Sequence, residues 1–172
     1  MPMYLYLGDI TRMETDAIVN AAGTDLRRCP GICDAIFAAA DTEELERACR
    51  KLGRCRIGQA VATPGCGLPC RYIIHVAGPG WDGGEPRERF LLAGCYQNAL
   101  HKAYLCSCRR VAVPLIFSGD CHLPRAASLR VAGAAIADFC QRHPSMEVTL
   151  VLYRQSIYDM AKRILGWEDA PS

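Results

Sequence analysis

The stretch "IVNAAGTDLRRCPGICDAI" at residues 18–36 has the pattern of a strand, a loop and the start of a helix. An apolar run ends at Asn20, a loop follows, and "CDAIFAAA" predicts a helix over about residues 34–40. Loops that lead from a strand into a helix are common phosphate sites, because the first N–H groups of the helix lack partners. Such loops usually carry several glycines, whereas this one contains "RRCPG". The stretch is therefore a phosphate cradle, an altered cradle or only a connection.

The same alternation continues along the chain. Further helices are predicted from Thr42, as N-cap, to a stop at Gly53, and over about 86–105, 124–142 and 156–167, the last capped by Ser156. Strands are predicted at 4–7, 16–20, 59–63, 71–77, 110–116 and 147–153. This order predicts one α/β domain over residues 1–172, with three α/β/α layers around a central mixed, mainly parallel sheet.

The bulk composition is that of an ordinary globular protein. The chain has 172 residues, of which 51% are hydrophobic and 22% charged, and its net charge is +2. This small charge predicts no strong attraction to nucleic acid or to a membrane surface. No apolar run reaches the roughly 18 residues of a membrane span, and the N-terminus has no signal-peptide pattern, so we expect a cytoplasmic protein.

Eleven cysteines are many for such a chain. They form no CxxC pair, and no histidine accompanies a pair at zinc-finger spacing, so we expect no metal site. The simpler interpretation is that they are reduced thiols acting as small core residues. Cys95 and Cys140 fit it best, since each falls on the apolar stripe of a predicted helix.

Ligands of open α/β sheets bind beyond the carboxyl ends of the strands. Two loops qualify here, at residues 20–33 and 117–124, and both lead into a helix N-terminus. Two anion-binding loops that face each other would suit a diphosphate.

Six blocks in order carry a resemblance to the macro domain family. It extends over about residues 4–153 and is closest to bacterial stand-alone macro proteins described as O-acetyl-ADP-ribose deacetylases. The blocks are "GDIT" (8–11), "DAIVNAA" (16–22), "GICDAI" (31–36), "IGQAVATPG" (57–65), "LPCRYIIHVAGP" (68–79) and "VAVPLIFSG" (111–119). The resemblance implies binding of ADP-ribose and hydrolysis of O-acetyl-ADP-ribose or of ADP-ribosyl adducts on proteins. It also implies a protein that needs no cofactor, and we expect a monomer.

The family's binding residues are carried over by position. Asp9 matches the aspartate that accepts a hydrogen bond from the adenine amino group, and Ile10 offers its backbone N–H to the base. Asn20 matches an asparagine beside the ribose next to the leaving group. The remaining expected contacts lie on the two phosphate loops: Gly31, Ile32, Cys33, Ser118, Gly119, Asp120, Cys121, His122 and Leu123.

The departures from the family fall mainly at the site. Its second signature asparagine aligns with Gly23, and the aspartate that activates water in one hydrolase branch aligns with Cys33, with Asp34 one residue later. Asn20, Cys33 and Asp34 are therefore the candidate catalytic residues. An offset of one residue turns a helical side chain by about 100°, which counts against Asp34. The helix N-terminus would lower the pKa of the Cys33 thiol, but no histidine pairs with it in the sequence.

Both loops differ in content too. The family's glycine run aligns with Arg28, Cys29 and Pro30, and a proline removes a donor N–H. Arg27 and Arg28 would compensate if they bound phosphate. In the second loop His122 stands for a glycine, Leu123 for an aromatic residue, and Asp120 adds a negative charge.

Three functions stay open from the sequence. The first is a hydrolase that removes acetyl or ADP-ribosyl groups, and the second is a non-catalytic module that binds ADP-ribose or a related nucleotide. The third is a changed macro fold with another ligand, either RNA ends or another phosphorylated metabolite.

Overall fold

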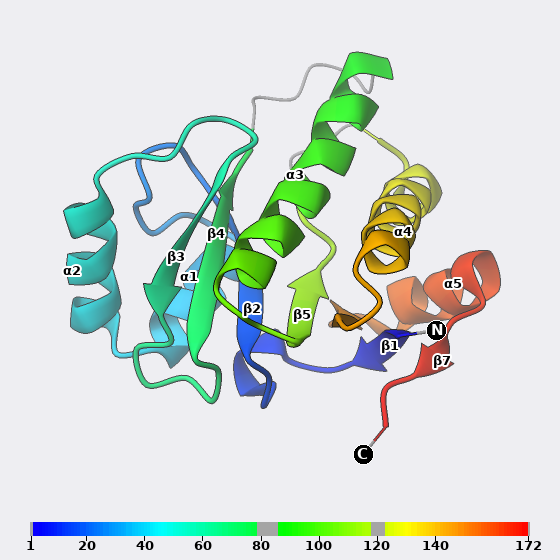
Figure 1. Ribbon diagram of the computed structural model, residues 1–172, viewed down its shortest axis with the longest axis horizontal. Coiled ribbons are helices and arrows are strands. Elements are labelled where there is room, and N and C mark those ends of the chain that lie inside the picture. Colours follow the sequence, from blue (N-terminus) through cyan, green and yellow to red (C-terminus); the bar gives the residue numbers. More distant parts are fainter. Residues whose placement is uncertain (1, 79–85, 118–122, 172) are drawn as a thin grey trace.

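The computed structural model describes residues 2–78, 86–117 and 123–171. Its seven strands form one sheet in the order β3-β4-β2-β5-β6-β1-β7 (Figure 1). The strands are β1 (Met3–Leu7), β2 (Ala17–Ala22), β3 (Ala60–Pro64), β4 (Tyr72–Ala77), β5 (Arg110–Pro114), β6 (Glu147–Leu152) and β7 (Glu168–Asp169). The helices are the 3-10 turn η1 (Ile10–Arg12), α1 (Ile32–Ala39), α2 (Thr42–Leu52), α3 (Pro86–Leu105), α4 (Arg125–Arg142) and α5 (Gln155–Leu165).

The sheet is mixed and mostly parallel, as predicted. Five of the described strand pairs are parallel: β4–β2, β2–β5, β5–β6, β6–β1 and β1–β7. The sixth pair, β3–β4, is antiparallel. The two-residue β7 was not predicted; it is too short to leave a periodic pattern in the sequence.

Helices cover both faces of the sheet. Side chains of α3, α4 and α5 gather in one core cluster, and those of α1 and α2 in a second. Neighbouring strand residues point to opposite faces, so Val19 of β2 joins the first cluster and Ile18 the second. Because both faces are buried, the central strands are continuous apolar runs. No described helix is long and apolar enough to cross a membrane.

Most predicted helices agree with the structure within two residues, but both predicted N-caps are wrong. The N-cap of α2 is Asp41, whose carboxylate accepts a hydrogen bond from the Glu44 N–H at 3.1 Å. The Thr42 hydroxyl instead donates to the Phe37 carbonyl at 2.7 Å. Helix α5 begins at Gln155, so Ser156 already lies inside it. The predicted stop of α2 at Gly53 is confirmed.

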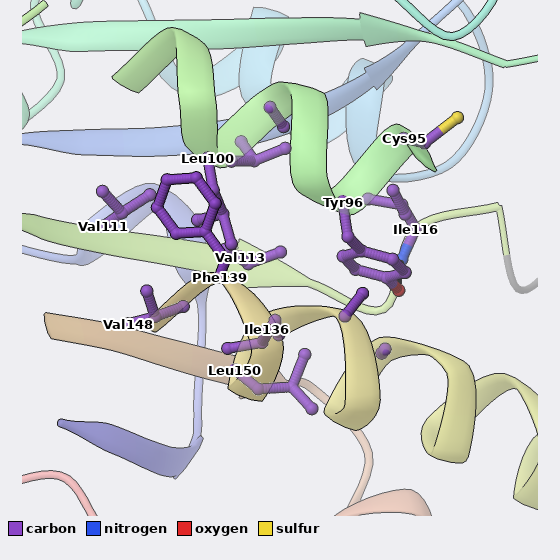
Figure 2. Packing of buried hydrophobic residues seen from close by; sticks show 14 of the residues in the cluster. Cys95, Tyr96, Leu100, Val111, Val113, Ile116, Ile136, Phe139, Val148 and Leu150 are labelled. Carbon is purple, nitrogen blue, oxygen red and sulfur yellow. Dashed lines mark hydrogen bonds between the residues drawn. The ribbon is translucent and has the colours of Figure 1, made fainter. Parts of the chain in front are cut away.

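Tyr96 of α3 links the hydrophobic core to the segment that follows the carboxyl end of β5. Its side chain is fully buried between α3, α4 and β5 (Figure 2). Its hydroxyl oxygen accepts a hydrogen bond from the backbone N–H of Ile116 at 2.9 Å. Ile116 follows β5 where the chain leaves the sheet, so this bond positions the segment that leads into the second predicted phosphate loop.

Replacing Tyr96 with phenylalanine should destabilise the fold. The Tyr96→Phe variant keeps the ring but leaves the buried Ile116 N–H without its acceptor, which should cost about 1–3 kcal/mol of unfolding free energy. Urea unfolding measures the change. Tyr104→Phe is the matched control, because Tyr104 is 43% exposed and its substitution should cost under about 0.5 kcal/mol. Equal losses in the two variants would contradict the assignment.

Candidate functional site

A cleft of about 1000 Å³ lies at the carboxyl edge of the parallel strands. Residues after five strands line it, together with the N-terminus of α1. They include Gly8–Ile10 after β1, Ala21–Gly23 at the end of β2, Gly78 after β4, Pro114, Leu115 and Phe117 at the end of β5, Val151–Arg154 at the end of β6, Cys29–Ile32 before α1, and Arg125 and Ile157 from α4 and α5. The sheet therefore places its cleft where open α/β sheets bind ligands.

The order of the strands sets the length of this cleft. Between the ends of β2 and β1 lie β5 and β6, so three strand spacings separate Asn20 from Asp9. At about 4.8 Å a spacing this is about 14 Å. Such a distance suits an elongated ligand with different groups at its two ends.

Asp9 lies at the β1 end of the cleft, where it caps η1. Its Oδ1 accepts hydrogen bonds from the Thr11 N–H at 2.9 Å and the Thr11 hydroxyl at 2.7 Å. Among the described residues Oδ2 has no hydrogen-bond partner, so it keeps its capacity to accept one from a ligand. Ile10, the second residue expected to contact a base, lines the cleft beside it.

Three residues that line the cleft between the ends of β5 and β1 were missed by the sequence reasoning. Tyr153 follows β6 with 80% of its surface exposed, Arg154 comes next, and Arg125 begins α4. The sequence predicts Tyr153 as the last residue of a strand, whereas β6 ends at Leu152. The signal for Tyr153 in the sequence is its place after a parallel strand, because ligands bind at the carboxyl ends of such strands.

At the β2 end the "RRCPG" loop is organised around the sulfur of Cys33. The thiol is buried, accepts a hydrogen bond from the Cys29 N–H at 3.3 Å and donates to the Arg27 carbonyl at 3.8 Å. Asn20 donates to the same sulfur from Nδ2 at 3.7 Å. Cys33 is thus buried and is hydrogen-bonded to the backbone of the loop at Cys29 and Arg27. It is not among the described residues that line the cleft.

Asn20 is also buried, and it belongs to a polar chain across three strands. Its Nδ2 lies 3.0 Å from Nδ1 of His75 on β4, and Nε2 of His75 lies 3.0 Å from the Thr63 hydroxyl on β3. An amide N–H faces Nδ1, so the imidazole carries its proton on Nε2 and donates it to Thr63. Oδ1 of Asn20 has no partner among the described residues.

Burial lowers the pKa of His75 to about 4. Protonation would also place a second N–H donor against the Asn20 amide, which already donates to Nδ1. The sequence reasoning did not single out this histidine, because a lone His inside the apolar run "YIIHVA" gives no sign of its partners.

Cys29 is the half-buried member of the thiol pair and lines the cleft. Burial, with a further contribution from the neighbouring Cys33, raises its pKa to about 12. Cys29 is therefore protonated at neutral pH, which does not favour a nucleophilic role.

Asp34 is not among the described residues that line the cleft. Its Oδ1 lies 2.6 Å from Nε of Arg28, and the side chain is 57% exposed. The pair closes a shallow depression formed with Cys29, Pro30 and Gly31 on the outer side of the loop. Arg28, proposed as a substitute for the missing glycines, thus has a carboxylate partner in this structure.

Two glycines give the cleft its shape. Gly31 caps α1 with φ of 87°, a conformation that side-chain-bearing residues rarely adopt. Gly78 faces Phe117, and a Cβ on Gly78 would lie 2.4 Å from the Phe117 ring. The described lining near the end of β2 is consequently small or apolar, with Ala21, Ala22, Gly23 and Phe117.

Five expected binding residues lie outside the described part of the chain: Ser118, Gly119, Asp120, Cys121 and His122. Leu123 is buried in the first core cluster. In the described ranges no group of three metal-ligating side chains comes together.

Comparison with known proteins gives consistent results. A family model described as "Macro domain" matches residues 19–132. A macro domain-containing protein of Lactiplantibacillus plantarum is 41% identical over 85% of this chain and 86% of its own. A protein of Escherichia fergusonii named O-acetyl-ADP-ribose deacetylase is 38% identical over 95% of this chain and 94% of its own.

Solved structures show the same fold. The Oceanobacillus iheyensis macrodomain with ADP superposes with a TM-score of 0.87 at 31% identity, covering 94% of this chain and 88% of that one. A Trypanosoma brucei macrodomain in complex with ADP-ribose gives 0.85 at 26% identity, covering 95% and 69%.

The lowered pKa of His75 predicts a loss of stability in mild acid. In the unfolded chain His75 titrates near 6.5, whereas in the folded protein it titrates near 4. Above pH 6.5 both states are neutral. Between pH 6.5 and 4 only the unfolded chain takes up the proton, so the free energy of unfolding should fall by up to about 3 kcal/mol.

Urea unfolding at several pH values from 7.5 to 4.5 tests this. A His75→Gln variant, less stable at neutral pH, should lack this part of the pH dependence. If wild type and variant lose the same free energy between pH 7 and 4.5, the histidine is not held neutral.

Proposed function

The chain belongs to the macro domain family, and from this we propose that its cleft binds ADP-ribose, with the adenine at the β1–β6 end and the terminal ribose at the β2 end. The observation that carries the proposal is the pairing of Asp9 and Tyr153 on one end of a cleft whose other end is the N-terminus of α1. Structural relatives named as complexes with ADP and ADP-ribose support it.

Adenine recognition rests on two side chains. Asp9 offers its free Oδ2 to the exocyclic amino group, and Oδ1 is already fixed by Thr11, so the carboxylate is oriented before the ligand arrives. The exposed ring of Tyr153 offers a flat surface on which a base stacks, a contact worth about 1–3 kcal/mol.

The diphosphate lies across the middle of the cleft. The first N–H groups of α1, after Gly31, face it and carry the positive end of the helix dipole. Pro30 removes one donor from the loop, and the Cys29 N–H is used by the Cys33 sulfur. This loop therefore offers fewer backbone donors to phosphate than a glycine-rich one.

The terminal ribose meets a mostly apolar wall. Asn20 is buried against His75, Cys33 is bonded to the backbone of its own loop, and Asp34 pairs with Arg28. None of these three candidate catalytic residues is among the described residues that line the cleft. Asp9 is the one carboxylate among the described lining residues, and it lies three strands away. We therefore propose ligand binding as the first candidate function of this cleft and hydrolysis as the second.

Replacing Asp9 with asparagine should reverse its preference among bases. In Asp9→Asn the amide oxygen keeps the cap on Thr11, while the N–H₂ group replaces the acceptor that adenine needs. Calorimetry should show at least about tenfold weaker binding of ADP and ADP-ribose. The base of inosine diphosphate carries an oxygen at that position. The affinity of Asp9→Asn for this ligand should therefore fall less than its affinity for ADP, or should rise.

Glu14→Gln is the control, since Glu14 is not among the described lining residues. Unchanged discrimination between the two bases in Asp9→Asn would refute the adenine assignment. If wild type binds no ADP-ribose at millimolar concentration, the proposed function itself fails.

Hydrolysis of O-acetyl-ADP-ribose is the second candidate, favoured by the named activity of the Escherichia fergusonii relative. Since no described side chain is placed as a general base at the ribose end, such a reaction would depend on a water molecule positioned by the ligand's own phosphates and by the loops.

Turnover separates the two candidates. Chromatography should follow release of acetate from O-acetyl-ADP-ribose by wild type and by Asp9→Asn. Activity that belongs to this cleft should show a KM at least about tenfold higher in the variant. Activity identical in both proteins would exclude this cleft, and tight binding without turnover would leave a non-catalytic module.

A further inference from the structure

We propose that Arg125 and Arg154 form a second anion subsite, which binds a phosphate group on the adenosine ribose of the ligand. The preferred ligand would then be an adenosine diphosphate compound phosphorylated on the 2′ or 3′ oxygen. This inference rests on the proposed function, because it uses the placement of adenine beside Asp9 and Tyr153.

The first observation is that both arginines line the cleft without an ionic partner. Neither forms an ion pair or a side-chain hydrogen bond with any described residue. Arg28 at the other end differs, because Asp34 already holds it at 2.6 Å. Among the described lining residues, the positive charge without an ionic partner therefore lies after β5 and β6, on the side of the cleft toward Asp9.

The second observation is that these charges sit where helices disfavour them. Arg125 is the first residue of α4 and Arg154 is the N-cap of α5, so each adds positive charge to the positive end of a helix dipole. Neither helix has an acidic residue in its first turn. Helix α2 shows the usual order, with Glu43 and Glu44 first and Arg50 and Lys51 last. A bound anion would offset the unfavourable interaction between each arginine and the positive end of its helix dipole.

The third observation is that the two helices start side by side. They follow β5 and β6, which are parallel neighbours, and they pack against each other. At Gly133 of α4 a methyl group would come within 2.4 Å of a methyl carbon of Leu165 in α5. Packed helix axes lie about 8–10 Å apart, a gap that two arginine side chains can close around one phosphate. Figure 1 shows α4 and α5 next to each other at this end of the sheet.

The order of residues after β6 indicates which part of the ligand the arginine subsite would contact. Arg154 directly follows Tyr153 at the end of β6, and both residues line the same cleft, so we place the guanidinium near the nucleoside whose base stacks on that ring. The diphosphate lies farther along the sheet, toward α1. A phosphate ester on the ribose carries a charge near −2 at pH 7 and matches the bidentate geometry of guanidinium groups. Asp9 is the one carboxylate among the described lining residues. With Arg125 and Arg154 included, the net charge of these three side chains is +1.

Calorimetry with two ligand pairs tests the subsite. One pair is ADP-ribose and 2′-phospho-ADP-ribose, and the other is ADP and 3′-phospho-ADP. In at least one pair the phosphorylated member should bind wild type about tenfold tighter or more. Arg125→Ala and Arg154→Ala should each reduce this affinity ratio several-fold, and the double variant should bring it to about one. Arg130→Ala, on the exposed side of α4, should keep the wild-type ratio.

The outcomes separate this inference from the proposed function. If ADP-ribose binds but neither phosphorylated ligand binds tighter, the subsite is refuted and the proposed function stands. If Arg154→Ala weakens both members of a pair by the same factor, the arginine holds the diphosphate, which also refutes the subsite. If no ligand binds, both proposals fail.

Discussion

A buried polar chain joins the sheet to the loop that shapes the cleft, and the rest of the site depends on it. Thr63, His75 and Asn20 lie on three neighbouring strands, and Asn20 passes the chain on to the sulfur of Cys33. That sulfur in turn binds both the Cys29 N–H and the Arg27 carbonyl. Every group in this chain is desolvated, so a missing partner would cost more than the bond itself contributes. This network of hydrogen bonds therefore fixes the path of a loop that has Arg28, Cys29 and Pro30 where the family has glycines.

This use of Cys33 explains how the loop tolerates its unusual residues. An aspartate at the same place would bring a charge into a site that holds a neutral histidine and no described cation. A thiol accepts and donates weakly without that cost. The position thus supports the loop from the protein side, and chemistry at the ligand side falls to groups elsewhere in the cleft.

The two ends of the cleft have opposite character as a result. The β2 end is small-chained and apolar, with Phe117 packed on Gly78, whereas the lining after β5, β6 and β1 carries Asp9, Tyr153 and two arginines that have no ionic partner among the described residues. In the proposed complex the adenosine half of the ligand therefore makes most of the polar contacts. This asymmetry connects the proposed ADP-ribose binding with the proposed phosphate subsite.

Hydrophobic periodicity and local motifs act over a few residues, so they were enough to predict the family, the mixed sheet and most of the helices. The sequence also placed Asp9, Gly31 and Ile32 at strand and helix ends, where the structure has them line the cleft. Only the tertiary structure decided where side chains point. It turned Asn20 and Cys33 inward, paired Asp34 with Arg28 outside, and brought Tyr153, Arg154 and Arg125 into the cleft. The strand order β2-β5-β6-β1 assembles residues more than a hundred positions apart, and no local pattern encodes which partner each side chain then meets.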